Sequence, residues 1–344
     1  MDGGIMGGRI TALEVAARAG VSRSAVSRVF TPGASVSKST ADKVRQAADA
    51  LGYRPNVIAR SLITGRSRII GLVVAYLENQ FYPEAIERLS KSLQEQGYHL
   101  LVFMASNDAA ETEDVIQELL DYQVDGIIAA SVGLSNDLTQ RCAAIGIPVV
   151  LFNRSQPDMA LSSVTSANFE GGQKLAEFLV AGGHRRIGHI AGWEGASTQI
   201  EREAGFVAGL AKHGLSLCAR GFGNFSIEDA RTAAREMFGG DARPDAVFVA
   251  NDHMAFGVMD VLRYELDLRI PQDVSVVGYD DVSLSAWPSY DLTTVRQPAN
   301  QMVAHTVRIL LDRIEEGDTP PQHVALDGPL IIRGSARIAE GQDR

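Results

Sequence analysis

The sequence has only two cysteines among its 344 residues, Cys142 and Cys218, and neither lies in a paired or metal-binding motif. A chain so poor in cysteine has no disulfide framework, and we expect it in a reducing compartment, the cytoplasm. It also lacks an apolar run near the ~20 residues that cross a membrane. Its start, MDGGIMGGRI, lacks the basic flank and apolar core of a secretory signal. These absences argue against a membrane protein and against export.

Motifs for catalysis are missing as well. The chain has no G-x-x-x-x-G-K-[ST] loop and no G-x-S-x-G elbow, and RGFGNFS lacks the third glycine of a dinucleotide fingerprint. Its seven histidines are scattered without the spacing of a metal site. We therefore expect no catalytic residue, no cofactor and no metal.

Charge is distributed unevenly along the chain. Residues 1–68 hold 11 Lys and Arg against 4 Asp and Glu, a net charge of +7, and the rest holds 21 against 38, a net charge of −17. A small basic head on an acidic body indicates that the head alone meets a polyanion. The alternative is a solvated surface arm, which would need no folded pattern.

The head has such a pattern between residues 9 and 54. Thr11 and Glu14 form the S/T-x-x-E pair of a capping box before a first helix. Gly20 can take the positive φ of a tight turn, Ser22 can cap a second helix, and a third helix is predicted to end at Gly52. Three helices around one small core are the helix-turn-helix plan.

In a helix-turn-helix unit the second helix enters the major groove of DNA. The polar residues at its start and along it are Ser22, Arg23, Ser24, Ser27 and Arg28. Arg23 and Arg28 can bond bidentately to guanine, and the serines Ser22 and Ser27 can bond phosphate. An arginine on a short helix is more often merely solvated, but the turn glycine and the local charge favour DNA contact here.

A linker follows at residues 55–67. Asn56 can cap a helical stretch that ends at Leu62, but this stretch is far below the ~12 to 15 residues of a helix stable alone. Leu62 lies among arginines that include Arg60, an arrangement suited to wedging between bases in a minor groove. We include Asn56, Arg60 and Leu62 among the predicted DNA contacts. The alternative is an ordinary flexible linker.

Beyond the linker, apolar runs alternate with amphipathic helical patterns. The runs are RIIGLVVAY, HLLVFMA, VDGIIAAS and PVVLFNR, then RRIGHIAG, DAVFVAND and VSVVGYDD. This βα repetition predicts an α/β body with parallel sheets in two similar lobes.

Polar side chains follow several of these predicted strands, where ligands of parallel sheets collect. They are Asn153, Arg154, Asn251 and Asp280, and Arg202 lies early in a later helix. A guanidinium and a carboxylate that face one cleft, such as Arg202 and Asp280, supply the directional bonds that sugar hydroxyls need. Caps and turn formers are the alternative, which we favour for Asp252 and Asp281.

Aromatic residues are only 6% of the chain, so their positions are informative. Phe81 and Tyr82 are adjacent in the predicted loop LENQFYP, and both tryptophans, Trp193 and Trp287, fall in predicted loops. A buried ring usually belongs to the core, but rings in loops at the edge of a cleft can stack on a ligand. We include Phe81, Tyr82 and Trp193 among the predicted ligand contacts.

Five stretches together resemble the lactose-repressor (LacI/GalR) family of bacterial transcription regulators over roughly residues 10–338. They are ALEVAARAGVSRSAVSRVF, LGYRPNVIARSLITGRS, VVGYDD, ANDHMA and LTTVRQP. The resemblance implies base reading by Arg23, Ser24 and Arg28, a hinge helix with Leu62 as the intercalating leucine, and a body of the two-lobed periplasmic-binding-protein type I fold. It also implies effector contacts, at Asn153, Arg202, Asn251, Asp280 and Gln297. Departures from the family pattern are Ala25 and Thr31 in the head and Ala299 after Gln297.

The implied domains are the head at 9–54, the hinge at 55–67 and the effector-binding and dimerisation body at 68–338. We expect lobe 1 at about 68–166 and 297–322, and lobe 2 at about 167–296 and 323–338. We predict a homodimeric repressor that binds a pseudo-palindromic operator in double-stranded DNA and is released by a sugar-like inducer. One alternative is a two-lobed carbohydrate sensor or carrier without a regulatory role. Another is a regulator that requires a different small metabolite as corepressor.

Overall fold

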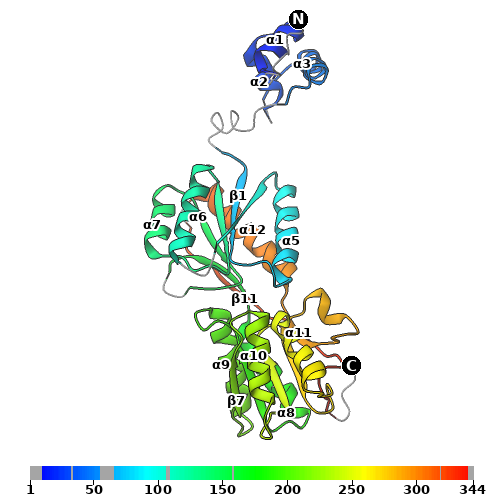
Figure 1. The fold of residues 1–344 in the computed structure, drawn as a ribbon. Coiled ribbons are helices and arrows are strands. Elements are labelled where there is room, and N and C mark those ends of the chain that lie inside the picture. Colours follow the sequence, from blue (N-terminus) through cyan, green and yellow to red (C-terminus); the bar gives the residue numbers. More distant parts are fainter. Residues whose placement is uncertain are drawn as a thin grey trace, which may run out of the picture. The chain divides into compact units, whose positions relative to one another are not determined.

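The computed structural model describes residues 10–31, 34–54, 66–105, 109–156, 159–317 and 319–339 (Figure 1). The expected roles of Asn56, Arg60 and Leu62 therefore lie outside the described residues. The chain divides into two units, Met1–Arg68 and Ile69–Arg344. The first is the head and the second is the body.

The head contains three helices around a small apolar core. They are α1 (Ala12–Ala19), α2 (Arg23–Val29) and α3 (Lys38–Leu51). Val15, Val26 and Val44 are fully buried and come one from each helix. Each helix therefore needs the other two to bury its apolar face. This arrangement confirms the predicted helix-turn-helix head.

The ends of these helices follow the capping residues in the sequence. Thr11 and Glu14 form the capping box, with the Thr11 amide donating to Glu14 Oε2 at 2.7 Å. The Ser22 hydroxyl accepts from the Ala25 amide at 3.2 Å and starts α2. Gly20 and Gly52 end α1 and α3 with φ of +65° and +66°, in the left-handed region that glycine adopts without strain.

The body is built on two six-stranded sheets. The first has the strand order β11-β5-β4-β3-β1-β2 and the second β12-β10-β9-β8-β6-β7. The first sheet contains β1 (Ile69–Val74), β2 (His99–Met104), β3 (Gly126–Ala130), β4 (Val149–Phe152), β5 (Ser162–Ser166) and β11 (His323–Leu326). The second contains β6 (Ile187–Ala191), β7 (Ala219–Phe222), β8 (Ala246–Val249), β9 (Ser275–Asp280), β10 (Thr293–Arg296) and β12 (Leu330–Ile331). All pairings are parallel except that of β12 with β10.

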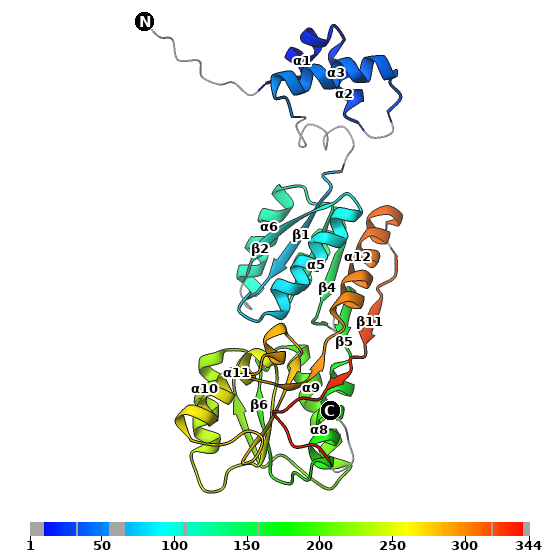
Figure 2. The same cartoon turned by 90° about the vertical axis from the view of Figure 1, so that its right-hand side faces the viewer.

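Helices cover both faces of the first sheet (Figure 2). On one face, α5 (Phe81–Glu95) and α12 (Ala299–Glu316) pack on a core that contains Ile70 and Leu72. On the other, α6 (Ala109–Asp121) and α7 (Asn136–Ala144) pack on a core that contains Val73 and Ile127. Neighbouring residues of β1 thus enter different cores, because side chains alternate along a strand and both faces are covered.

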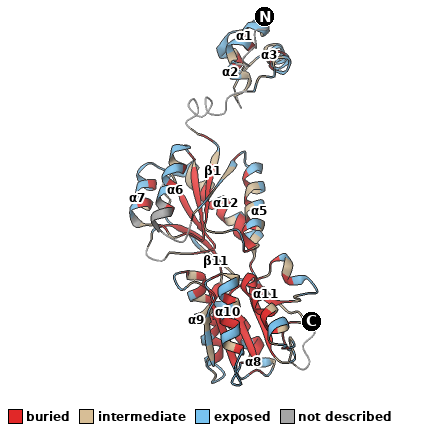
Figure 3. Ribbon diagram, in the orientation of Figure 1, coloured by how far each residue is buried: buried red, intermediate tan, exposed pale blue. Residues whose placement is uncertain are grey.

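The second sheet is covered in the same manner, and its central strands are buried (Figure 3). Its helices are α8 (Asn168–Ala181), α9 (Ser197–Ala211), α10 (Ile227–Phe238) and α11 (Asp252–Asp260), the last continued by a π-helical turn η1 (Val261–Glu265). A short 3₁₀ helix, η2 (Ser283–Ala286), follows β9. Two α/β lobes with parallel sheets are therefore present, as predicted.

The chain crosses between the two sheets three times, after β5, after β10 and after β11. We expected residues 323–338 in the second lobe, and this boundary is wrong for its first four residues. His323–Leu326 pairs with β5 in the first sheet, with Val164 opposite Val324. Val324 and Leu326 pack on the core beneath α12, so strand β11 completes the edge of the first sheet before the chain returns.

Candidate functional site

The predicted DNA-reading residues share one exposed surface of the head. Ser22, Arg23, Ser24, Ser27 and Arg28 are all exposed, whereas Val26 of the same helix is fully buried. The burial of Val26 fixes α2 on the head and turns its polar side outward. The Ser22 hydroxyl already serves as the cap of α2 and also lies 2.9 Å from the Ser24 hydroxyl.

In the body, side chains from several elements contact Asp280, which lies at the end of β9. Its carboxylate accepts from Gln297 Nε2 at 2.7 Å and from Asn79 Nδ2 at 3.0 Å, and it lies 3.3 Å from Arg202 Nη2. All four residues are at most 4% exposed. Burial raises the pKa of Asp280, while the charge of Arg202 and the hydrogen bonds from Asn79 and Gln297 oppose that rise.

The side chain of Arg202 contacts α8 and residues at the ends of strands in the second sheet. Its Nε donates to Asn168 Oδ1 at 2.9 Å and its Nη1 to the Ala250 carbonyl at 2.8 Å. Its guanidinium lies over the ring of Tyr279, 3.7 Å from the centroid. An arginine fixed in this manner loses little side-chain entropy on meeting a ligand, because its rotamer is already set.

The close crossing of α8 and α9 brings Arg202 to this position. A Cβ on Gly172 would lie 2.2 Å from the Arg202 carbonyl oxygen, and one on Gly205 would lie 1.9 Å from the Phe169 carbonyl oxygen. Both distances are far below van der Waals contact with backbone atoms. Glycine is therefore required at both positions for the two helices to approach this closely.

The two other aspartates near Asp280 bind protein groups. Asp252 accepts from the Val282 amide, the Ser285 hydroxyl and the Thr294 hydroxyl at 2.6 to 3.1 Å. Burial and the nearby charge of Asp280 raise the pKa of Asp252 to about 8. Asp281 binds two arginines, with Arg296 Nε and Arg333 Nη2 each at 2.6 Å. Both carboxylates hold the turn after β9 in place, in agreement with the structural role that we favoured for them.

Phe81 and Tyr82 lie in the first turn of α5, although we expected them in a loop. Gln80 precedes the helix without a side-chain cap bond, and the Asn79 side chain accepts from the Phe81 amide at 3.1 Å. Phe81 stacks on Phe152 within the core. The hydroxyl of Tyr82 accepts from Asn153 Nδ2 at 2.8 Å and also bonds Ser131.

Arg154 is 6% exposed. It lies against two aromatic rings of the second lobe. Its guanidinium carbon is 5.5 Å from the ring centre of Trp193 and 5.9 Å from that of Phe225. We did not single out Phe225 from the sequence. Its position just after β7, at the carboxyl end of a strand, is the same signal that pointed to Asn153 and Asp280.

Two buried acceptor oxygens in this region have no hydrogen-bond partner among the residues that the structure describes. They are Oδ1 of Asn153 and Oε1 of Gln297. Asn251, by contrast, uses its Oδ1 to cap α11 through the Met254 amide at 3.0 Å. A buried acceptor without a donor is costly, so these two oxygens suit a ligand that brings donors.

The structure thus links most of the predicted effector residues into connected sets. Bonds join Arg202, Asp280 and Gln297, a second bond joins Tyr82 to Asn153, and ring contacts join Arg154 to Trp193. The described residues include no cluster of three or more His, Cys, Asp or Glu that could hold a metal ion. No helix within those residues is both long and apolar enough to cross a bilayer.

A helix-turn-helix head joined to a two-lobed body of the periplasmic-binding-protein type defines a DNA-binding transcription regulator with a ligand-binding domain. Sequence comparison agrees for both parts. Residues 11–56 match the bacterial regulatory proteins of the lacI family, and residues 176–336 match a periplasmic binding protein-like domain.

Relatives match over almost the whole chain. The transcriptional repressor PurR of Vibrio vulnificus is 32% identical over 331 residues, which are 95% of this chain and 98% of PurR. The ribose operon repressor of Escherichia coli K12 is 31% identical over 332 residues, 95% of this chain and 99% of that repressor. The chain belongs to the LacI family.

Solved structures give the same result. The lac repressor dimer bound to operator and the anti-inducer ONPF has a TM-score of 0.86 at 27% identity, with 95% of this chain and 99% of that chain covered. The CelR-cellobiose complex has a TM-score of 0.71 at 31% identity, with 95% and 100% covered. The protein is thus a DNA-binding transcriptional repressor and not an enzyme, which excludes the alternative of a carrier without a regulatory role.

Proposed function

We propose that this repressor controls genes for the use of a carbohydrate and that a small sugar-like molecule releases it from DNA. The observation that carries the proposal is a pair of buried acceptors without a partner among the described residues, Gln297 Oε1, whose side chain bonds Asp280, and Asn153 Oδ1, whose side chain bonds Tyr82. A sugar hydroxyl donates one hydrogen bond and accepts others, so it can satisfy an amide oxygen while it meets a guanidinium. Trp193 adds a ring face beside the guanidinium of Arg154.

Two of the similar proteins favour a sugar over other metabolites. One is named the ribose operon repressor, and the other was solved with cellobiose. The site also has the mixed donor and acceptor groups that a polyol needs. We place the effector contacts at Phe81, Tyr82, Asn153, Arg154, Trp193, Arg202, Asn251, Asp280 and Gln297.

For DNA, we propose that the protein acts as a cytoplasmic homodimer on a pseudo-palindromic operator. One head makes too few base contacts to select one site in a genome, so two heads are needed, about one helical turn apart. Arg23 and Arg28 are the proposed base readers because both are exposed on α2. In this proposal Leu62 enters the minor groove at the centre of the operator.

Effector and DNA are coupled through the body. A sugar that favours one arrangement of the lobes changes the spacing of the two linkers and so lowers the affinity for DNA. Thermodynamic linkage requires that DNA lower the affinity for the sugar by the same factor. Coupling of ~1 to 3 kcal/mol is typical for such systems.

Isothermal calorimetry on the full chain tests the effector proposal, with D-ribose, D-xylose, cellobiose and, as a flat non-sugar probe, adenine. At least one sugar should bind, and Arg202→Ala should weaken it by about 100-fold or more because Asp280 then stays buried without its cation. Lys212→Ala is the matched control, since Lys212 lies at the end of the same helix with half of its side chain exposed. Adenine binding without sugar binding, or an unchanged affinity in Arg202→Ala, would contradict the proposal.

A gel-shift series with operator DNA at graded salt tests the DNA contacts and the sign of the response. Arg23→Ala should cost about 1 to 3 kcal/mol and relax preference at one base position. The exposed Arg45 on α3 supplies the control Arg45→Ala, which should keep that preference. Added sugar should release the DNA, whereas tighter binding would identify the sugar as a corepressor.

A further inference from the structure

A short segment of the first lobe makes direct contact with the turn after β9 in the second lobe. Asn79 Nδ2 donates to Asp280 Oδ2 at 3.0 Å. The Ser283 amide donates to Glu84 Oε1 and the Ser283 hydroxyl to Gln80 Oε1, each at 3.4 Å. We call residues 78–84 the interlobe segment. It joins the lobes at the same carboxylate that the effector proposal assigns to the ligand.

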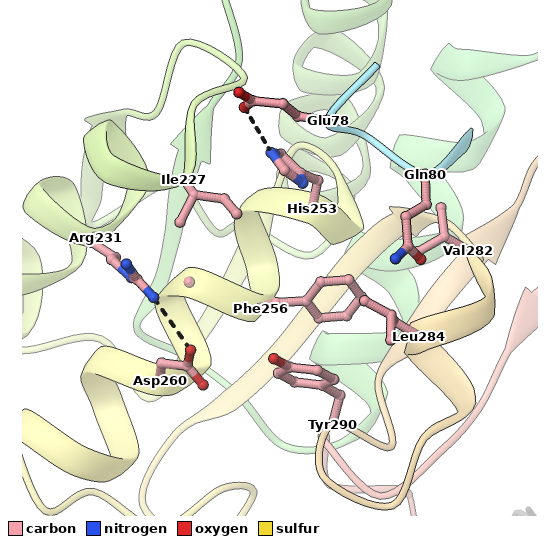
Figure 4. Close-up of a pocket in the computed structure, with 11 residues that line it drawn as sticks. Glu78, Gln80, Ile227, Arg231, His253, Phe256, Asp260, Val282, Leu284 and Tyr290 are labelled. Carbon is pink, nitrogen blue, oxygen red and sulfur yellow. Dashed lines mark hydrogen bonds and ion pairs between the residues drawn. The ribbon is translucent and has the colours of Figure 1, made fainter. Parts of the chain in front are cut away.

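The same segment borders a cavity of about 280 Å³ on the side of α11 (Figure 4). Glu78 and Gln80 of the segment face His253 and Val282 of the second lobe there. Glu78 Oε2 is 3.9 Å from His253 Nε2, and the Glu78 side chain is 81% exposed. Burial lowers the pKa of His253, so the imidazole is largely neutral at neutral pH and this pair is weak.

Asn79 makes the strongest of the contacts between this segment and the second lobe. It is 3% exposed, and its Oδ1 accepts from the Phe81 amide at 3.1 Å while its Nδ2 reaches Asp280. The bond at the start of α5 fixes the direction of the amide group. The bonds of Ser283 are long and exposed, so they add little. A charge-assisted bond from a fixed, buried donor is stronger.

Both oxygens of Asp280 accept hydrogen bonds from protein donors in this arrangement. Oδ1 accepts from Gln297 and faces Arg202, and Oδ2 accepts from Asn79. Asn79 takes one of the two acceptor positions of Oδ2, so a sugar hydroxyl that approaches along that direction competes with the Asn79 amide. We propose that Asn79 is an internal competitor of the effector at Asp280, and that its displacement loosens the contact between the lobes. This inference rests on the proposed role of Asp280 in effector binding.

Loss of this bond acts on the first sheet through strand β1. β1 starts at Ile69, where the head unit ends, and runs to Val74, five residues before Asn79. It is hydrogen-bonded to β2 on one side and β3 on the other. A central strand moves with its whole sheet, so release at Asn79 acts on the first sheet as one unit.

Asn79→Ser tests the proposal because serine keeps a side-chain acceptor for the Phe81 amide but is too short to reach Asp280. Hydrogen–deuterium exchange on the full chain without sugar should show several-fold faster exchange at residues 79–82 and 282–285. Gln80→Ala, next to it in the chain, is the control and should leave both regions unchanged. Unchanged exchange in Asn79→Ser would overturn the interlobe contact, whether or not any sugar binds.

Calorimetry with D-ribose and cellobiose tests the competition. Removal of a bond to a charged acceptor from the sugar-free state should tighten sugar binding by about tenfold. Equal or weaker binding would show that Asn79 does not compete with the sugar. Asn79→Asp keeps an acceptor for the Phe81 amide but repels Asp280, so it should have the same direction of effect and serves if the serine variant folds poorly. Failure of the effector proposal looks different, because sugar binding is then absent in the wild type or insensitive to Arg202→Ala.

Discussion

Replacement of Gly205 by alanine should destabilise the body although alanine is the better helix former. Gly205 lies where α9 crosses α8, and an added Cβ would be 1.9 Å from the Phe169 carbonyl oxygen. A carbon and an oxygen in tight contact are about 3.3 Å apart, so the helices must separate there by about 1.4 Å. The obstacle is backbone, which cannot rotate away as a side chain can.

The expected loss follows from two opposing terms. Alanine in place of glycine stabilises a helix interior by ~1 kcal/mol, and overpacking of a well-packed site costs typically 1 to 3 kcal/mol, occasionally more. Because the clash is between two backbones, we expect a cost at the upper end of that range, about 3 kcal/mol, so that the free energy of unfolding falls by about 2 kcal/mol. The same shift would move Arg202, three residues earlier on α9, away from Asn168 and Asp280 and weaken sugar binding.

Urea unfolding followed by tryptophan fluorescence measures this loss selectively, since the two tryptophans, Trp193 and Trp287, both lie in the body. Gly257→Ala on α11 is the control, because a Cβ there would first meet the Ile227 side chain at 3.0 Å. Gly209→Ala should fall between the two, with its Cβ 2.6 Å from the Cβ of Ala176. A Gly205→Ala midpoint at or above that of the wild type would refute the reasoning.

Two further predictions concern other parts of the molecule. Burial lowers the pKa of His189 to about 4 in the folded chain, whereas the pKa of histidine in an unfolded chain is about 6.5. As pH falls, the unfolded chain therefore takes up this proton before the folded chain does. The free energy of unfolding should decrease as pH falls from about 6.5 toward 4. The contribution of this histidine to that decrease is about 3 kcal/mol, and urea unfolding of His189→Gln should show a correspondingly shallower pH dependence; equal slopes would contradict it. In the head, Val26→Ala should lower the free energy of unfolding by about 2 kcal/mol because buried methyl groups are lost. On heating, this variant should therefore lose operator binding at a lower temperature than sugar binding. Simultaneous loss of both would argue against an independently folded head.

The features of the head could be predicted because each depends on neighbouring residues. The Thr11–Glu14 box spans four positions, and Gly20 and Gly52 each end a helix by their own backbone conformation. Such signals need no knowledge of distant contacts. The alternation of strands and helices in the body is local in the same sense, and it was sufficient to predict two lobes with parallel sheets.

The parts that sequence reasoning missed depend on distant partners. Asn79 bonds a carboxylate 201 positions away, and nothing near it in the sequence indicates that bond. Phe225 was overlooked because RGFGNFS was considered only as an incomplete dinucleotide motif. The predicted start of the second lobe at residue 323 was too early for the same reason. His323–Leu326 joins the first sheet because it pairs with the edge of β5, a distant partner in the sequence.

The three aspartates at the ends of β8 and β9 differ in their partners and in their charge. Asp281 is neutralised by Arg296 and Arg333, and the raised pKa of Asp252 leaves it largely protonated at neutral pH. Burial also raises the pKa of Asp280, and the charge of Arg202 beside it opposes that rise. The cluster is therefore close to neutral as a whole, which disfavours a polyamine or a metal cation as its ligand. Uncharged hydroxyl groups, which can meet an acceptor and a guanidinium together, fit this balance better, and this is the physical reason for expecting a sugar.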